Sequence, residues 1–203
     1  MTKELVKKAL LAQYLLIVYN ALEGILSIFF GNVANSIALI GFGLDSAIES
    51  LSTIIVTLRL RKTGKVSKKE EEKHESNALN LVGYSFIFLA IYVGFESIRK
   101  LVTYETSDPS LPGILIALAS IIVMPIFSKY RHGLGHEIKS KSLIADSKQT
   151  LLCVYMSYAL LGGVGLNYLF GWWWADPIAG LIIVVAAVQE GINSLKGKEC
   201  CSV

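Results

Sequence analysis

Long apolar segments separated by clusters of charge constrain the fold of this chain more than any other feature. Six stretches are apolar and long enough to cross a bilayer, whose core of about 30 Å needs about 20 residues of helix. Charged residues make up 17% of the 203 residues, whereas a soluble domain carries about 25%. This distribution predicts an integral membrane protein and excludes a soluble α/β enzyme, a disordered tail and a nucleic-acid binder.

The apolar segments are expected to be helices, because lipid offers no hydrogen-bond partners to backbone amides and carbonyls. They leave no room for a separate soluble domain, so residues 1–203 are expected to form a single transmembrane domain. The expected fold class is therefore all-α, a six-transmembrane-helix bundle. The basic start of the chain is interpreted as part of an uncleaved first helix rather than a signal peptide. The spans lie at about 10–30, 35–58, 78–100, 112–128, 143–168 and 175–195.

The distribution of lysine and arginine predicts the orientation of the bundle, because cytoplasmic loops of membrane proteins are enriched in both. With six spans, sixteen of the 19 basic residues fall on one side. This side includes the N-terminus, the loops after the second and fourth spans, and the C-terminal tail. Both termini are therefore expected to be cytoplasmic, with the protein in the cell (inner) membrane.

Two carboxylates of the second span are the strongest candidates for a functional site. Burying a carboxylate at the bilayer centre costs about 2.5–3.5 kcal/mol or more, so each one needs a reason. Asp45 and Glu49 are four residues apart, which places them on one face of a helix, one turn apart. Two bare carboxylates at that spacing repel each other, and a divalent cation between them removes the repulsion and releases protons. The alternative is a pair of protonated acids that hydrogen-bond to neighbouring helices.

The fifth span supplies a second set of candidate ligands. Asp146, Gln149 and Cys153 lie at positions i, i+3 and i+7, on one helical face. A Cys153 thiolate would favour a borderline ion such as zinc, although a buried cysteine can equally be a small packing residue. Gln149 offers a neutral, weak oxygen ligand. Asp146 is nearer the end of the span and could instead cap the helix or line an entrance path.

Other polar residues have two open interpretations. Glu23 could line the same cavity or hydrogen-bond to a neighbouring helix. Three histidines and two terminal cysteines could hold metal at the cytoplasmic entrance or be solvated surface groups. These residues are His74, His132, His136, Cys200 and Cys201.

Short motifs in three spans resemble the cation diffusion facilitator family. The second span has Ser36-Ile-Ala-Leu39 followed by Asp45-x-x-x-Glu49, and the sixth begins with Asp176-Pro-Ile-Ala-Gly180. The fifth has Ala145-Asp146 followed by Gln149 and Cys153, where the family usually has His-x-x-x-Asp. A counterpart of the family's cytoplasmic C-terminal metal-binding domain is not expected, because only about ten residues follow the sixth span. The chain therefore resembles a short branch of the family, similar to zinc-binding transmembrane proteins of synaptic vesicles.

The resemblance implies a six-helix bundle that forms homodimers and exports divalent metals in exchange for protons. We accordingly expect a transporter of a divalent metal cation, with Zn²⁺ as the transported ion, that works by proton-coupled efflux and alternating access. Its expected metal ligands are Asp45, Glu49, Gln149 and Cys153. The alternative is a membrane-embedded metal-binding or partner protein without transport activity. An enzyme is not expected, because no second catalytic signature accompanies the acid pair.

Overall fold

Six helices form the regular structure of the described part of the chain. The computed structural model describes residues 2–62 and 68–196, and the side chains of 4–61, 80–140 and 142–196. The all-α six-helix bundle expected from the sequence is confirmed, and all six helices are long and apolar enough to cross a membrane. The helices are α1 (Thr2–Val33), α2 (Ile37–Lys62), α3 (Lys68–Thr103), α4 (Leu111–Glu137), α5 (Lys141–Phe170) and α6 (Ala175–Leu195).

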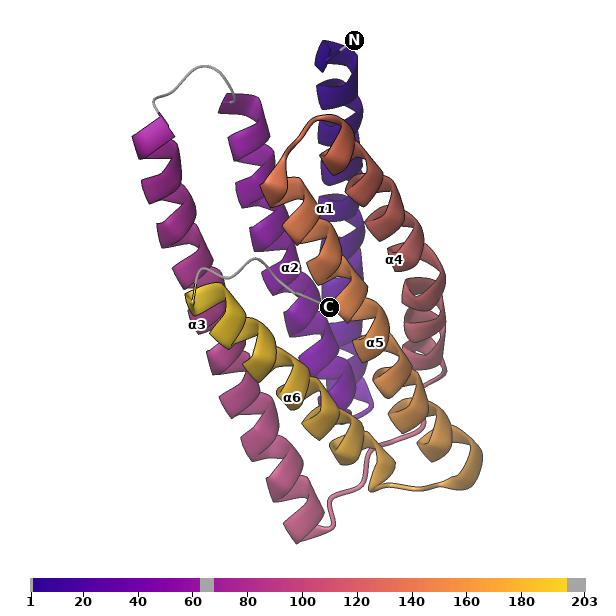
Figure 1. Cartoon of the computed structure of the whole chain (residues 1–203). Helices are drawn as coiled ribbons and strands as arrows, with labels where there is room; N and C mark the ends of the chain where they lie inside the picture. Colours follow the sequence, from indigo (N-terminus) through magenta and orange to yellow (C-terminus); the bar gives the residue numbers. More distant parts are fainter. Residues whose placement is uncertain (1, 63–67, 197–203) are drawn as a thin grey trace.

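Consecutive helices run antiparallel, and short turns join α1 to α2, α4 to α5 and α5 to α6. Figure 1 shows the connections after α1, α3 and α5 at one end of the bundle and the connection between α4 and α5 at the other end. The closest helix pairs are α1 with α2, α3 with α6, and α4 with α5. Helices α2 and α5 also contact each other, and they bring their polar residues together inside the bundle.

Helix α4 is longer than the hydropathy of the sequence predicts. It ends at Glu137, whereas the apolar run ends near residue 128. The final turns stay helical because their inward face is polar and packs on α5, with the Ser128 hydroxyl donating to the Ser147 carbonyl at 2.6 Å. Arg131, His132 and His136 are therefore helical residues, and the prediction that the fourth span ends near residue 128 and places them in the following loop was wrong. Arg131 is fully buried, so it does not belong among the loop charges that indicate orientation.

Helices α1 and α2 approach each other closely at a pair of glycines. A Cβ added at Gly43 would lie 2.9 Å from the Gly24 carbonyl oxygen and 2.9 Å from the Ser27 Cβ. Small residues at this position allow the two backbones to touch, as is common in membrane proteins. The contact also brings Ser46 of α2 against the side chain of Glu23 on α1.

The Asp176-Pro motif joins the start of α6 to the start of α2. The Asp176 carboxylate accepts hydrogen bonds from the Ile37 amide at 2.9 Å, the Ser107 hydroxyl at 3.0 Å and the Ser36 hydroxyl. A carboxylate at a helix N-terminus satisfies amides that have no partner within the helix. This motif therefore has a structural role, at the end of the bundle where α1 turns into α2.

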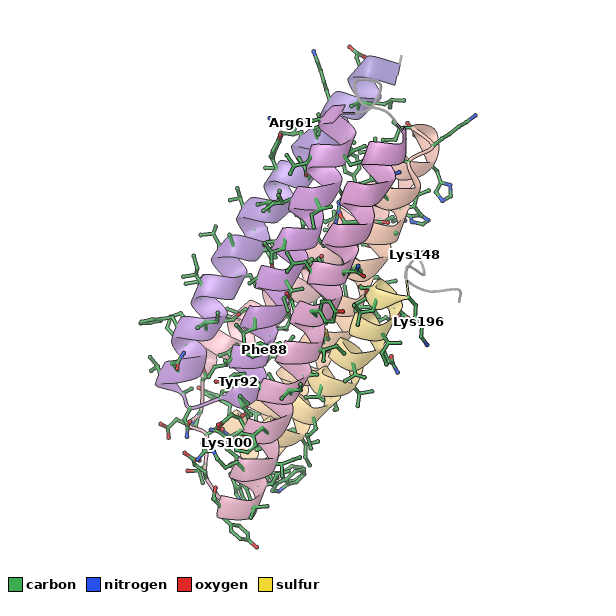
Figure 2. All side chains as sticks on the ribbon, turned by 90° about the vertical axis from the view of Figure 1, so that its left-hand side faces the viewer. Arg61, Phe88, Tyr92, Lys100, Lys148 and Lys196 are labelled. Atoms are coloured by element: carbon green, nitrogen blue, oxygen red, sulfur yellow. The ribbon has the colours of Figure 1, made fainter. Side chains whose placement is uncertain are left out.

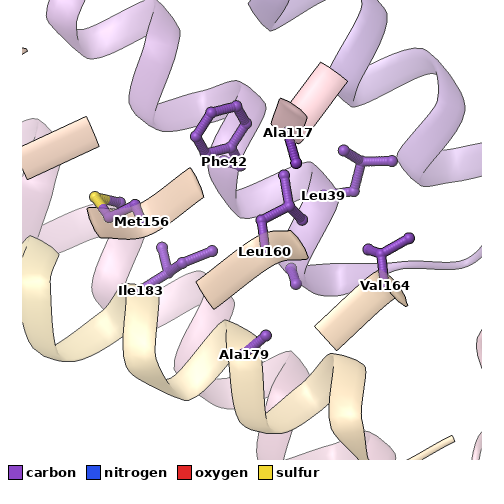
Figure 3. Close-up of a cluster of buried hydrophobic side chains, with 9 residues drawn as sticks. Leu39, Phe42, Ala117, Met156, Leu160, Val164, Ala179 and Ile183 are labelled. Carbon is purple, nitrogen blue, oxygen red and sulfur yellow. The ribbon is translucent and has the colours of Figure 1, made fainter. Parts of the chain in front are cut away.

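Apolar side chains cover the outside of the bundle and also fill its interior. Phe88 and Tyr92 of α3 project outward midway along the bundle, whereas Arg61 and Lys100 lie toward opposite ends (Figure 2). Inside, side chains from α2, α4, α5 and α6 form one packed cluster (Figure 3). The labelled members of this apolar cluster are Leu39, Phe42, Ala117, Met156, Leu160, Val164, Ala179 and Ile183.

Candidate metal site

A cysteine of α5 meets two carboxylates of α2 in the middle of the bundle. The Cys153 thiol lies 3.1 Å from Asp45 Oδ2 and 3.0 Å from Glu49 Oε2, within donating distance of both oxygens. All three side chains are at most 3% exposed. The two helices thus bring together two oxygen ligands and one sulfur ligand, and we call Asp45, Glu49 and Cys153 the thiol–acid site. The sequence placed each residue on the correct helix face, and the structure shows that the two faces meet.

The thiol–acid site opens onto a pocket between α2, α3, α5 and α6. Its polar lining includes Asp45, Cys153, Gln149 and Glu190, and its apolar lining includes Phe86 and Met156 among others. Met156 also belongs to the apolar cluster, which therefore borders the pocket on one side. A cation held here would be enclosed largely by low-dielectric side chains, which strengthen its attraction to the carboxylates.

Glu190 of α6 is a pocket residue that the sequence analysis missed. It is buried and contributes another carboxylate to the lining of the pocket. The signal that could have found it was present, because residue 190 lies within the sixth expected span. The cost of burying a carboxylate in lipid applies to it as to Asp45 and Glu49.

Gln149 lines the pocket, and its carbonyl oxygen already has a partner. Gln149 Oε1 accepts a hydrogen bond from the Ser52 hydroxyl at 3.0 Å. The amide nitrogen of Gln149 is buried and has no partner among the described groups. A metal ligand from Gln149 would therefore be an oxygen shared with Ser52.

The donor set of the thiol–acid site combines two hard oxygens with one soft sulfur. Among the described side chains, no group of three or more His, Cys, Asp or Glu residues is arranged as a ready-made metal cage. The thiol and the two acids are instead linked by the thiol's own hydrogen, which a bound cation would displace. Sulfur and carboxylate ligands together suit zinc and similar borderline ions.

Asp146 belongs to a different cluster and pairs with a buried arginine. It forms an ion pair with Arg131, and both side chains are almost fully buried. Its carboxylate also accepts hydrogen bonds from the Ser52 hydroxyl at 3.0 Å and the Gln13 amide at 3.2 Å. Asp146 does not cap α5, whose N-cap is Ser140. Its charge is compensated within the bundle, so nothing in this geometry favours Asp146 as a metal ligand.

A single hydroxyl connects this ion pair to the thiol–acid site. Arg131 Nη1 donates to Thr150 Oγ1 at 2.8 Å, and Thr150 Oγ1 donates to Glu49 Oε1 at 2.6 Å. We call Arg131, Asp146 and Thr150 the arginine network. The sequence did not indicate the role of this network, because Arg131 follows the apolar run and its charge is typical of a cytoplasmic loop.

The remaining candidates lie away from the thiol–acid site. Glu23 of α1 is buried and accepts hydrogen bonds from Ser46 of α2 and Ser120 of α4. His132 and His136 face each other on α4, with their Nε2 atoms 3.2 Å apart, and His132 Nδ1 lies 3.1 Å from the Ser147 hydroxyl. The side chains of His74, Cys200 and Cys201 lie outside the part of the structure that is described.

Six helices long enough to cross a membrane, with several acidic side chains buried between them, define an integral membrane protein. Comparison with known families places it further: residues 14–197 match the model of the cation efflux transmembrane domain. The chain therefore belongs to the cation efflux family, which is a family of transporters rather than of enzymes. The resemblance to the cation diffusion facilitators is thereby confirmed.

Individual relatives are similar to this chain at low identity. An uncharacterized transporter of Methanocaldococcus jannaschii is 28% identical, over 87% of this chain and 64% of its own length. A cadmium, cobalt and zinc/H(+)-K(+) antiporter of Bacillus subtilis is 26% identical, over 94% of this chain and 61% of its own. Transmembrane protein 163 of Xenopus laevis is 24% identical, over 93% of this chain and 66% of its own length. The chain thus spans about two thirds or less of the length of these relatives.

Proposed function

We propose that this protein carries a divalent metal cation across the membrane, with zinc as the ion that fits the site best. The observation that carries the proposal is the thiol–acid site, where two carboxylates and a thiol from α2 and α5 converge in the bundle. None of the ion pairs among the described residues involves Asp45 or Glu49. Two negative charges without a bonded counter-charge match a doubly charged ion.

The proposed chemistry exchanges protons for the metal. Cys153 binds metal as a thiolate, so the proton on Sγ must leave when the ion binds. Any proton held by Asp45 or Glu49 must leave in the same way. Metal and protons therefore compete for the same atoms, and the more acidic compartment favours metal release. Proton-coupled efflux by alternating access follows if the inward-open and outward-open states differ in their affinity for the two ions.

The surroundings of the pocket support alternating access. The apolar cluster borders the pocket toward the end where α1 turns into α2. The arginine network lies on the opposite side, toward the connection between α4 and α5. Each could close one route to the thiol–acid site, the first by excluding water and the second by presenting a positive charge. Transport would then require each barrier to open in turn.

Several finer features of the proposal rest on relatives and on the resemblance. The name of the Bacillus subtilis antiporter includes cadmium, cobalt and zinc, together with H(+) and K(+). This name supports a divalent metal ion of borderline softness as the transported ion here. The family resemblance favours a homodimer. The basic residues that remain in loops and at the ends favour cytoplasmic termini in the cell membrane.

Zinc flux into proteoliposomes tests the function. We expect the full chain to move zinc and Asp45→Asn to reduce the initial rate at least tenfold, because one of the two charges is lost. Glu96→Gln is the matched control: it removes a carboxylate of α3 that pairs with Arg99, outside the thiol–acid site. Wild-type rates in Asp45→Asn would contradict the site. Zinc binding without flux in the unmodified protein would instead favour a metal-binding protein that does not transport.

A further inference from the structure

Glu23 lies in a third buried polar cluster, which includes no residue of the thiol–acid site or of the arginine network. Its carboxylate accepts hydrogen bonds from the Ser46 hydroxyl at 2.8 Å and from the Ser120 hydroxyl. The Tyr19 hydroxyl in turn lies 3.3 Å from Ser120 Oγ. Glu23 is 5% exposed and takes part in none of the ion pairs among the described residues. Three helices, α1, α2 and α4, thus surround one carboxylate with hydroxyl groups.

Polar groups one turn before and one turn after Glu23 are buried without partners. Asn20 and Ser27 are both 0% exposed. Neither the amide nitrogen nor the amide oxygen of Asn20 has a hydrogen-bond partner among the described groups, and nor does the Ser27 hydroxyl. Positions i−3 and i+4 share a helix face with Glu23. Since each unsatisfied buried group costs about 1–3 kcal/mol, this face is built to contact water or a ligand.

The chemistry of the cluster distinguishes its ligand from that of the thiol–acid site. Glu23 supplies one negative charge, and its neighbours supply oxygen atoms and one amide. The thiol–acid site supplies two carboxylates and a sulfur. A singly charged, hard ligand fits the first and a doubly charged, borderline ion fits the second. The proton is the singly charged ligand that a carboxylate and hydroxyl groups hold directly.

The two serines have the geometry needed to accommodate both protonation states. Ser46 Oγ lies 3.1 Å from the Phe42 carbonyl oxygen, and Ser120 Oγ lies 3.1 Å from the Ile116 carbonyl oxygen. When Glu23 is ionised, each hydroxyl can donate to the carboxylate. When Glu23 carries a proton, either hydroxyl can turn to its backbone carbonyl and accept from the acid. No buried donor or acceptor of this trio is then left without a partner.

We propose that Glu23 is a proton-binding site for the counter-ion of transport, served by a hydrated face of α1 formed by Asn20, Glu23 and Ser27. The proposal rests on the proposed function, because it adds a second place for the proton to the atoms of the thiol–acid site at which metal and protons compete. The titratable groups that act on Glu23 are Tyr19 on its own helix and the carboxylates of Asp45 and Glu49 on α2. Helix α4 contributes the hydroxyl of Ser120. A divalent cation at the thiol–acid site would change the charge near Glu23 and would thereby couple the two ions.

The first test separates metal binding from proton coupling. We expect Glu23→Gln, reconstituted as the full chain, to bind zinc within about twofold of the unmodified protein by calorimetry. We expect an imposed pH gradient to accelerate zinc flux in the unmodified protein, and this acceleration to fall at least tenfold in Glu23→Gln. Glu96→Gln should keep the acceleration. Full acceleration in Glu23→Gln, or loss of zinc binding, would overturn the proposal.

A second test does not depend on transport. Dicyclohexylcarbodiimide is apolar and modifies protonated carboxyl groups within membranes, and mass spectrometry locates the adduct. We expect modification of Glu23 in the unmodified protein, at a rate that falls as the pH rises. In Asn20→Leu we expect Glu23 to be protected from modification, because the leucine excludes water from this face of α1. Absence of the adduct at every pH would overturn the proposal. If the unmodified protein does not transport zinc but Glu23 still forms the carbodiimide adduct, the transport function is contradicted. The assignment of Glu23 as a proton-binding residue is not contradicted by that result.

Discussion

Helix α5 contributes to two clusters of buried acids, one with a fixed counter-charge and one without a bonded counter-charge among the described residues. Asp146, in the arginine network, is neutralised by a buried Arg131 and by hydrogen bonds from α1 and α2. Two turns along α5, Cys153 meets Asp45 and Glu49, and none of the ion pairs among the described residues neutralises those acids. The first cluster carries its own cation, whereas the second has no bonded cation among the described residues, and this leaves room for the proposed metal ion. Buried charge alone does not indicate a transport site, and the presence of a fixed counter-charge is the distinguishing feature.

Removing the fixed cation should produce the largest effect on stability. Arg131→Met leaves Asp146 as an uncompensated buried charge, and breaking such a pair costs about 3–5 kcal/mol. We expect a loss of this size in the free energy of unfolding, measured by denaturant titration in micelles. The double variant Arg131→Met with Asp146→Leu should recover most of it, because neither charge remains. A loss below about 1 kcal/mol in the single variant would show that the network does not hold the bundle together.

The thiol–acid site should instead gain stability from an added cation. A ligand that binds only the folded state stabilises it by about 2.7 kcal/mol at a free concentration of 100 Kd. We expect zinc to raise the unfolding temperature of the unmodified protein and of Asp146→Asn, and a chelator to reverse the rise. In Glu49→Gln the rise should be largely lost. An equal rise in Glu49→Gln would mean that zinc binds elsewhere.

The sequence predicted the parts of this site that depend on helix periodicity. Asp45 and Glu49 are four residues apart on α2, and Gln149 and Cys153 four apart on α5, so each pair had to share a face. Hydropathy likewise predicted six spans, because a lipid-facing helix must be apolar along its length. These features are local, and one helix at a time is enough to derive them.

The arginine network could not be derived in that way. Arg131 follows the apolar run of α4, and nothing local distinguishes an inward-facing arginine from one in a cytoplasmic loop. Its role depends on the packing of α4 against α5, which places it opposite Asp146. Hydropathy shows where a helix stops facing lipid, and α4 continues beyond that point because its partner satisfies its polar groups.

The smallest predicted effect concerns the hydroxyl that joins the two clusters. Thr150→Val removes the hydrogen bonds from Arg131 at 2.8 Å and to Glu49 at 2.6 Å. Each of the two hydrogen bonds contributes about 1 kcal/mol net, so we expect a loss of about 2 kcal/mol in the free energy of unfolding.

Thr57→Val is the matched control for this variant, because Thr57 is also buried on a helix but donates to the Thr53 carbonyl at 2.7 Å, within its own helix. A double-mutant cycle of Arg131→Met and Glu49→Gln should show a coupling energy in the unmodified background that disappears in Thr150→Val and persists in Thr57→Val. Coupling that survives in Thr150→Val would mean that Arg131 acts on Glu49 through the electric field of its charge and not through this hydroxyl. The arginine network and the thiol–acid site would then be less separate than their hydrogen bonds indicate.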